Sequence, residues 1–442
     1  MDQENEDLVD RVHDLSDLEL AVLLSLTSHG NCVIGTPEDA VQQLVQELAL
    51  ISRGTFGLSY TVADCHSYMT LEEFQKSLLL DARSCTSAES SRASTSSHHD
   101  VKDHLAYGIA TEDRYRLSQI APQVSDSPGA RSPRSDAKSR VSAPQIANVV
   151  IAKNLNLAPA TVQIQALELL RNQRFITDTA VQAAPRTFLI IAVVAAERGF
   201  LWTGDDCTAT DVSHPGRADG RAPHMTAHLN DHFSIGHWHD PDDGFPNIED
   251  RAEDDARSRR AEIISDSDSV VWRVESGEPG LTKASRDSEY RSMLPYFSEP
   301  DIGYLTTLSE NVRIDMEVLR YQMNIVAFLR LHRAVAIVGP SASGFSCVSP
   351  NATKHFEKLV RCLAPLHRLD YVTPALVALA ARKTYLHRIR TVPVGQRGSR
   401  PAIVHERSMQ WGSEKAAVEA FLERISPEDV IDDVLASVAP PV

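Results

Sequence analysis

Residues 32–42 of the chain read CVIGTPEDAVQ, and they contain the pattern that decides the fold class. The apolar run Cys32–Ile34 is typical of a short buried strand, and Gly35 ends it. A helical pattern follows from about Pro37 to Ile51, and Phe56–Val62 then alternates between apolar and polar residues, as a strand does. The order strand, helix, strand indicates an α/β domain.

Two further apolar runs extend this pattern. Ile146–Ala152 is rich in β-branched residues, as a central strand of a parallel sheet is, and an amphipathic helix is predicted after it over Thr161–Gln173. Phe188–Val194 is apolar throughout and predicts one more buried strand. Strands and helices that alternate at this spacing predict a parallel sheet with helices packed on it.

The 442 residues divide by composition and pattern into six predicted segments. Two of them are polar and contain too few apolar residues to form a core. The segments are 1–83 (first part of the α/β core), 84–142 (a disordered Ser-rich insertion), 143–240 (second part of the core), 241–302 (a polar flexible linker), 303–400 (a helical domain) and 401–442 (acidic C-terminal helices). Helices are expected at Val312–His332, Asn351–Leu366, Pro374–His387, Glu414–Arg424 and Pro427–Ser437.

The overall charge narrows the range of partners. The formal net charge is −16 and the sequence pI is about 5.5, so nucleic acid and anionic membranes are not expected partners. The six cysteines contain no CxxC pair and are expected to be reduced thiols. The N-terminal MDQENEDLVD has neither a basic segment nor an apolar one, so a secretory signal is not expected. The expected location is the cytoplasm, with the nucleus as the alternative.

The stretch after the first strand has the position of a phosphate-binding loop but not its residues. In GxxxxGK[ST] the backbone N–H groups hold phosphate, the lysine reaches the outer phosphates and the hydroxyl holds magnesium. Gly35 matches the first glycine, but Ala40 replaces the second, Val41 replaces the lysine and Gln42 replaces the Ser/Thr. A nucleotide would therefore lose its main cationic contact.

The same stretch has a purely structural interpretation. Thr36 is a favoured N-cap residue, Pro37 suits the first helical position, and Asp39 could complete a capping box. Glu38 and Asp39 also complement the positive end of the helix dipole, which would otherwise attract phosphate. A triphosphate would meet two carboxylates at this helix start.

Several motifs outside this loop resemble one protein family. Leu155–Pro159 follows a strand and precedes Gln163–Glu168, while Asp370–Pro374 and His387-Arg388 lie in the helical domain. In these motifs the chain resembles the AAA+ ATPases of the magnesium-chelatase/MoxR type. Within that family it resembles most the fungal proteins labelled magnesium chelatase. The resemblance covers more than half of the chain. It implies a three-layer P-loop-type α/β core with a C-terminal helical lid.

The resemblance also shows which residues would handle ATP, and each is replaced. Lys153 takes the place of the acid that orients the magnesium water, and Asn154 that of the glutamate that activates the attacking water. An ammonium group cannot ligate magnesium, and a neutral amide is no general base. Val194-Ala195 replace a polar sensor, His232 the finger arginine and Asn351 the second sensor arginine. These losses together indicate relaxed catalysis.

Three functions remain open from the sequence. The chain is a catalytically silent AAA+ protein that acts by binding, an ATP-dependent magnesium chelatase subunit that inserts magnesium into a porphyrin, or an ATPase with atypical motifs. No cofactor is predicted, and ATP with Mg²⁺ is expected only if the family activity is retained. A protein partner or a homo-oligomer is expected. Lys153 is expected to form a salt bridge with Glu38 or Asp39 in place of a bound nucleotide.

Two other stretches contain motifs of possible binding sites. Gly339–Ser346 has the spacing of a phosphate loop, but Phe345 stands at the lysine position, so a flexible insertion is the better interpretation. His224, His228 and His232 are four residues apart and could hold zinc on one helix face. Exposed or hydrogen-bonded histidines are the better interpretation, and no metal site is predicted over residues 224–239.

Overall fold

In the computed structural model, nine stretches of the chain are described. They are 3–80, 145–176, 181–196, 225–253, 295–338, 345–346, 348–391, 414–422 and 425–441. All of them belong to one compact unit, and the predicted Ser-rich insertion 84–142 lies outside the described residues. Of the segment predicted as a linker, 241–253 contains helical turns and 299–302 begins a helix, while 254–294 lies outside the description.

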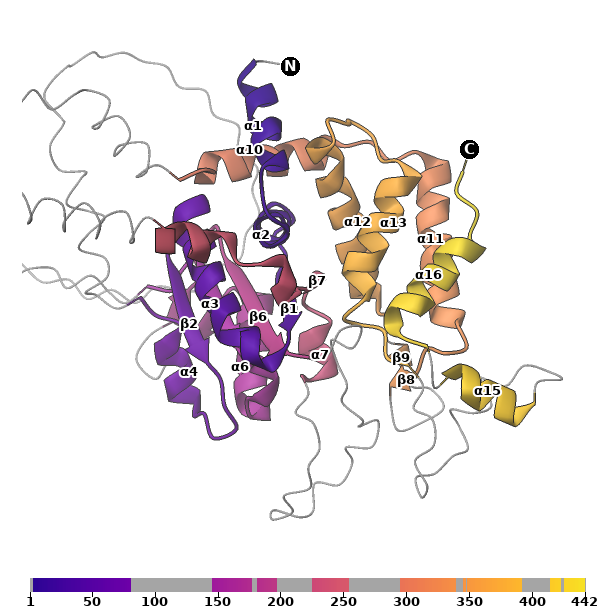
Figure 1. Cartoon of the computed structure of the whole chain (residues 1–442), viewed down its shortest axis with the longest axis horizontal. Coiled ribbons are helices and arrows are strands. Elements are labelled where there is room, and N and C mark those ends of the chain that lie inside the picture. Colours follow the sequence, from indigo (N-terminus) through magenta and orange to yellow (C-terminus); the bar gives the residue numbers. More distant parts are fainter. Residues whose placement is uncertain are drawn as a thin grey trace, which may run out of the picture. The chain divides into compact units, whose positions relative to one another are not determined.

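A five-stranded parallel sheet forms the centre of the core, in the order β2-β3-β6-β1-β7 (Figure 1). The strands are β1 (Cys32–Thr36), β2 (Tyr60–Asp64), β3 (Val149–Lys153), β6 (Leu189–Ala195) and β7 (Ile235–Trp238). The three predicted apolar runs are confirmed as β1, β3 and β6, the central strands of the sheet. The strand predicted at Phe56–Val62 begins later, at Tyr60, because residues 51–55 continue the preceding helix as a π-turn.

Alternate side chains of each strand pack on opposite faces of the sheet. On one face Ile34, Ile151 and Ile191 belong to a core that includes α2 (Asp17–Thr27) and α3 (Val41–Leu50). Residues next to these on the strands, such as Val33 and Val150, pack on the other face. There they meet the helices α4 (Leu71–Ser77), α6 (Ala160–Asn172) and α7 (Ala227–Asn230). The predicted three-layer arrangement is therefore confirmed.

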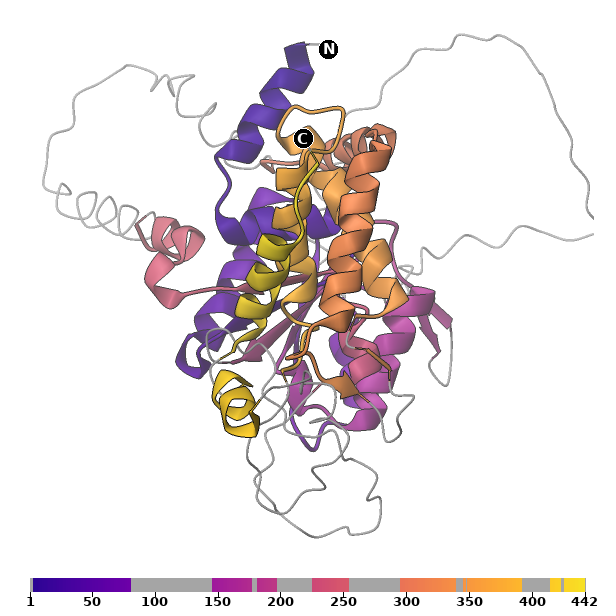
Figure 2. The ribbon, with the colours of Figure 1, turned by 90° about the vertical axis from the view of Figure 1, so that its right-hand side faces the viewer.

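Helices dominate the second half of the chain (Figures 1 and 2). They are α10 (Glu299–Asn311), α11 (Met316–Leu331), α12 (Pro350–Leu366), α13 (Pro374–Tyr385), α15 (Lys415–Leu422) and α16 (Pro427–Ser437). Four of them begin where a Ser or Thr side chain accepts a backbone N–H of the first turn, as Ser349 does from Ala352 at 3.0 Å. The N-terminal helix α1 (Gln3–His13) packs against α12.

The lid helices contact the core at two places. α10 and α12 pack on α2, and α13 packs on the edge strand β7. Short elements complete the fold: the hairpins β4 (Arg174–Ile176) with β5 (Val181–Ala183) and β8 (Ile337–Val338) with β9 (Phe345–Ser346), and the turns η1 (Glu38–Ala40), η2 (Ile51–Thr55), η3 (Leu155–Leu157) and η4 (Pro241–Asp243). Residues 339–344, the second candidate phosphate loop, lie outside the description. Among the described helices, none has the length and apolar character that a membrane crossing needs.

Candidate functional site

The first strand continues through the residues that would begin a phosphate loop. Gly35 is the register partner of Val194, and Thr36 is the partner of Ala195. The Gly35 carbonyl accepts the His239 N–H at 2.9 Å, and the Thr36 carbonyl accepts the Ala196 N–H at 3.0 Å. Both residues are thus strand residues, and they are fully enclosed by the neighbouring strands.

Thr36 does not cap a helix, so the predicted N-cap role is wrong. Its side chain is completely buried, and its Oγ1 has no hydrogen-bond partner in the described part of the chain. Asp39 forms no capping box, because the residue before α3 is Ala40 and no side chain caps this helix. The reason is that β1 continues through Gly35, which pairs with β6 and β7, and Thr36, which pairs with β6, so Thr36 is a strand residue and lies before the helix start.

The stretch that follows has the length of a phosphate loop but a different conformation. After Pro37 the chain makes one 3₁₀ turn, in which the Ala40 N–H donates to the Pro37 carbonyl at 3.1 Å. α3 then begins at Val41, four residues later than predicted. In a phosphate loop such N–H groups would point toward the anion, but here the Ala40 N–H is already hydrogen-bonded within the turn.

The residue in the lysine position points into the core. Val41 is only 4% exposed and belongs to the same apolar cluster as Leu44 and the strand residue Ile34. Its neighbours Gln42, Glu38 and Asp39 are exposed. The helix start therefore offers a solvent-facing ligand two carboxylates and an amide, and no cation.

Lys153 forms a salt bridge, but not the one that was expected. Its Nζ lies 3.0 Å from Asp64 Oδ2, and no ion pair joins it to Glu38 or Asp39, all of which are described residues. The register explains the difference, because Lys153 and Asp64 are direct partners at the ends of β3 and β2. The loop after β1 lies on the far side of β6, so a neighbouring strand supplies the counterion.

Asn154 has a backbone reason for its residue type. It adopts the left-handed conformation, with φ 55° and ψ 40°, and its N–H donates to the Val193 carbonyl at 2.7 Å. Asn tolerates this conformation much better than most residues do. A tight turn out of β3 is therefore what this position requires, and a glutamate would be strained in it.

The other two predicted positions lie where the lid meets the core. Asn351, at the start of α12, donates from Nδ2 to the Asp231 carbonyl at 3.0 Å, and Ser349 Oγ donates to Asp231 Oδ1 at 2.5 Å. His232 is half-buried, and its Nδ1 lies 3.1 Å from the carbonyl oxygen of His228. The finger loop Asn230–Phe233 is thus bound by the lid of its own chain, through Asp231 and not through His232.

A buried arginine from the end of the lid completes this junction. Arg388 is 3% exposed; its Nη2 donates to the carbonyls of Phe233 at 2.5 Å and Asp231 at 3.0 Å, and its Nε lies 3.4 Å from Asp231 Oδ1. Burial lowers the pKa of Arg388 to about 10, and Asp231 opposes that shift. Burial and the nearby Arg388 lower the pKa of His355 to about 3, so this histidine is neutral beside the guanidinium. Sequence reasoning missed this network; the adjacent His387-Arg388 was its only signal.

Neutral histidines continue along the contact between β7 and α13. His387 is completely buried, its Nε2 lies 2.9 Å from the Phe233 carbonyl, and burial keeps its pKa well below the ordinary value. His237 on β7 lies 3.1 Å from Lys383 on α13, and burial and then this lysine lower the pKa of His237 to about 3. A Cβ at Gly236 would lie 2.6 Å from His387 Nδ1, so only glycine allows this approach.

The histidine stretch does not form a metal centre in the described residues. His224 lies outside them, His228 is exposed, and both His237 on β7 and His239 just after this strand are buried. Within the described ranges, no three His, Cys, Asp or Glu side chains come close enough to share an ion. The described histidines instead pack or make the single contacts given above.

In sequence, no family model and no curated protein matches the chain. Among solved structures, a suspected ATPase from Cytophaga hutchinsonii is similar over 100% of this chain and 94% of its own, with a TM-score of 0.50 and 12% identity. A full-length MCM homologue from Methanopyrus kandleri covers 87% of this chain and 60% of its own at 10% identity, but its TM-score of 0.38 is too low to support an argument. At such identities the likeness concerns the fold alone. Together with the strand order, it gives this chain the fold of the AAA+ ATPases, a P-loop-type α/β core followed by a helical C-terminal part.

Proposed function

We propose that this chain is an AAA+-fold protein that does not use ATP and acts by binding, as an adaptor or assembly component for other proteins or for its own copies. One observation carries the proposal: Val41, in the position of the phosphate-binding lysine, is buried in the core. A simple exchange of side chains would leave an open loop. Here the loop has closed into a 3₁₀ turn and the side chain has become part of the packing.

The metal and water positions support the same proposal. In the family that the sequence resembles, an acid at position 153 would orient the magnesium water. Lys153 instead neutralises Asp64, and Asn154 is needed for the turn that follows. Carboxylate oxygens are the protein ligands that Mg²⁺ prefers, and none is offered by these two residues. The exposed Glu38 and Asp39 add repulsion toward a triphosphate.

The junction between lid and core supports a binding role too. In the family that the sequence resembles, a finger arginine and a lid arginine handle the nucleotide. Here Asp231 of the finger loop accepts Ser349 Oγ and lies beside the buried Arg388, so the loop and the lid form one packed unit. A lid whose polar groups bind the core of its own chain in this way suits a scaffold that presents a surface to a partner.

The competing function is that of an ATP-dependent magnesium chelatase subunit, which the family resemblance implies. It requires Mg-ATP turnover, so a phosphate-release assay on the purified full-length protein separates the two functions. We expect no turnover above a buffer blank, with or without Mg²⁺. Turnover that Lys153→Ala abolishes while Lys76→Ala leaves it intact would overturn the proposal, because it would place the chemistry in this site.

A further inference from the structure

Three histidines lie along the junction between the lid and the core. His237 belongs to the edge strand β7 of the core and is 5% exposed, His387 follows α13 and is completely buried, and His355 on α12 is half-buried. Histidine is the side chain whose charge changes most readily around neutral pH. The contacts of these three rings therefore decide how the junction responds to acid.

The contact of His237 requires the neutral form of its ring. Its Nδ1 lies 3.1 Å from Nζ of Lys383, which is on α13 of the lid. An ammonium group can only donate hydrogen bonds, so His237 Nδ1 must supply a lone pair, and a protonated imidazole has none. Acid would replace this hydrogen bond between core and lid with two positive charges at the same place.

The contact of His355 has the same form. Its Nδ1 lies 2.9 Å from Nη2 of Arg388, and a guanidinium group is also a donor only. The same guanidinium donates to the finger loop of the core, at the carbonyls of Asp231 and Phe233. A charge on His355 would therefore repel the group that ties the end of the lid to this loop.

His387 adds a third neutral ring. Its Nε2 lies 2.9 Å from the Phe233 carbonyl oxygen, so this nitrogen carries the proton and donates it. Its Nδ1 is buried next to Gly236 of β7 and has no hydrogen-bond partner in the described part of the chain. Protonation would place a second N–H group, with a charge, where these residues offer no acceptor.

The groups around these rings mostly oppose protonation. Burial lowers the pKa of all three histidines, and neighbouring basic side chains lower it further. These neighbours are Lys383 and His239 for His237, Arg388, His232 and Lys358 for His355, and Arg388 and His355 for His387. Asp231 raises the pKa of His355, and the Phe233 carbonyl raises that of His387. Asp17 and Glu428 raise the pKa of Lys383 against the effect of burial, and so favour the charge beside His237.

We propose that acid releases the lid from the core, because protonation of these three histidines breaks the junction while the parallel sheet stays folded. The proposal is independent of the loss of nucleotide binding, since the same contacts would respond to acid in an active ATPase. It makes the surface that the chain presents at this junction dependent on pH.

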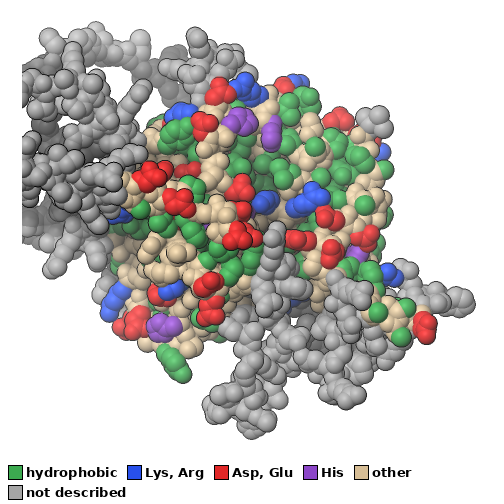
Figure 3. Space-filling view, viewed as in Figure 1, with side chains coloured by type: hydrophobic (Ala, Val, Ile, Leu, Met, Phe, Trp, Pro, Cys, Tyr) green, Lys and Arg blue, Asp and Glu red, His purple; other side chains and the backbone are tan. Residues whose placement is uncertain are grey.

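The overall charge does not account for such a release. The chain has 17 histidines and a formal net charge of −16, so mild acid lowers the net charge and with it the general self-repulsion. Figure 3 shows acidic and basic side chains interspersed over one face of the molecule, without a large patch of one charge. The response to acid therefore depends on local contacts.

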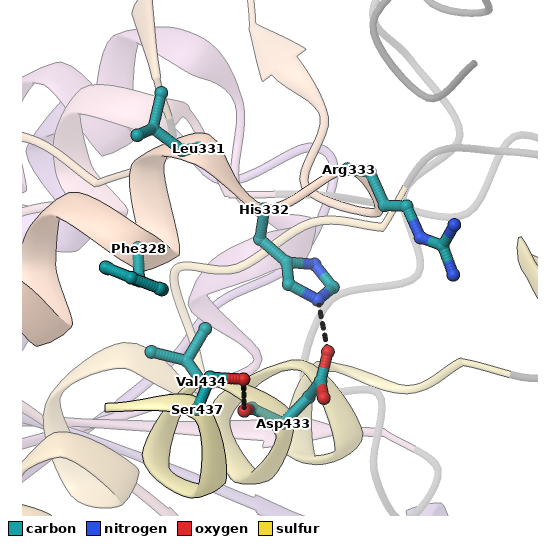
Figure 4. Close-up of a pocket in the computed structure, with 7 residues that line it drawn as sticks. All are labelled: Phe328, Leu331, His332, Arg333, Asp433, Val434 and Ser437. Atoms are coloured by element: carbon teal, nitrogen blue, oxygen red, sulfur yellow. Dashed lines mark hydrogen bonds and ion pairs between the residues drawn. The ribbon is translucent and has the colours of Figure 1, made fainter. Parts of the chain in front are cut away.

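A histidine within the lid has the opposite surroundings. Between α11 and α16 lies a hollow of about 470 Å³, bordered by Phe328, Leu331 and Val434 (Figure 4). There His332 points to Asp433, with Nε2 and Oδ2 3.0 Å apart. A proton on His332 would complete an ion pair, so mild acid leaves this contact inside the lid intact.

The size of the effect follows from two pKa values. The pKa values of His237 and His355 are about 3 in the closed junction, and about 6.5 once the rings are exposed. Their contribution to the closed state is complete above pH 6.5 and is lost as pH falls toward 3. Between about pH 7.5 and pH 5.0 the opening equilibrium should rise about 30-fold through His237 alone and about 1,000-fold through both histidines.

Backbone hydrogen exchange of the full-length protein tests the release, when it is resolved by mass spectrometry and corrected for the effect of pH on the chemical step. The reporter is the segment 229–239, which contains the finger loop and β7. The internal control is β2, the other edge strand, which packs on α3 and α4. From pH 7.5 to pH 5.0 we expect exchange to accelerate by at least about 30-fold in the segment 229–239, and by less than about threefold in β2.

A substitution at His237 assigns the effect. His237→Gln keeps an acceptor for Lys383 and cannot be protonated, so it should reduce the acceleration by at least about tenfold. His228→Gln, at an exposed histidine, is the matched control and should leave the acceleration unchanged. Circular dichroism at pH 7.5 checks that both variants are folded, and the comparison of the two edge strands needs no variant. Equal acceleration in both strands, none in the segment 229–239, or an acceleration that His237→Gln leaves intact would overturn the proposal.

Discussion

The substitution Val41→Lys distinguishes two interpretations of the stretch after β1: a closed turn with a buried position 41, or an open phosphate loop that lacks only its lysine. Val41 is 4% exposed, while its neighbour Gln42, in the same first turn of α3, is exposed. Val41→Lys loses about 1.5 kcal/mol of apolar burial. It also places an amine where burial lowers its pKa; a two-unit decrease would add about 2.7 kcal/mol. The expected loss in the free energy of unfolding is therefore about 4 kcal/mol.

Gln42→Lys is the matched control for this substitution. The helix dipole opposes a lysine at both positions, by about 0.3–1 kcal/mol, so the difference between the two variants isolates burial. Urea unfolding followed by circular dichroism should show a difference of about 4 kcal/mol between them. Equal, small losses would refute the reasoning, and so would a Val41→Lys variant that keeps its stability and gains Mg-ATP affinity, because both results would mean that position 41 faces an open phosphate loop.

Further predictions follow from the site. Arg388→Met should lower the free energy of unfolding by about 3 kcal/mol in urea titrations, since it removes a buried guanidinium that donates to the carbonyls of Asp231 and Phe233, whereas Arg313→Met, at an exposed ion pair, should change it by less than about 1 kcal/mol; similar losses would contradict the burial argument. Asn154→Glu should lower the melting temperature and Asn154→Gly should leave it nearly unchanged, because the left-handed conformation costs a residue such as glutamate about 1–2 kcal/mol. The folded-state pKa values of His237 and His355 are about 3, below their ordinary 6.5, so both residues are neutral in the folded protein. Their contribution to the free energy of unfolding is complete above pH 6.5 and is lost as pH falls toward 3, by about 2.7 kcal/mol per pH unit for the two histidines together. Equal free energies of unfolding at pH 7.5 and pH 5.5 would contradict this prediction.

The main layers of the fold could be predicted from the sequence because apolar periodicity reports burial directly. β3 and β6 are buried on both faces, so their sequences are continuous apolar runs. α16 was predicted at its observed bounds, since Ser426 and Pro427 mark its start by side-chain chemistry that acts within one turn. Such local signals do not depend on the rest of the chain.

The contacts of the site could not be predicted because they depend on register and on long-range packing. The sequence suggests a cap for Thr36, but β6 pairs with its backbone and keeps it in β1. From the sequence alone, Lys153 could pair with any of several acidic residues. Only the pairing of β2 with β3 places it beside Asp64. Arg388 and Asp231 are 157 residues apart, so nothing local indicates that they meet.

Titration calorimetry of the full-length protein with Mg-ATP tests directly whether this protein binds the nucleotide. The closed turn after Thr36, the buried Val41 and the Lys153–Asp64 pair predict no saturable heat at millimolar nucleotide. The variant Val41→Lys/Lys153→Asp/Asn154→Glu serves as the comparison, and its folded state is checked by circular dichroism before titration. Saturable binding of Mg-ATP to the unmodified protein with a Kd of about 1–10 µM, about −7 to −8 kcal/mol, would contradict the proposed function.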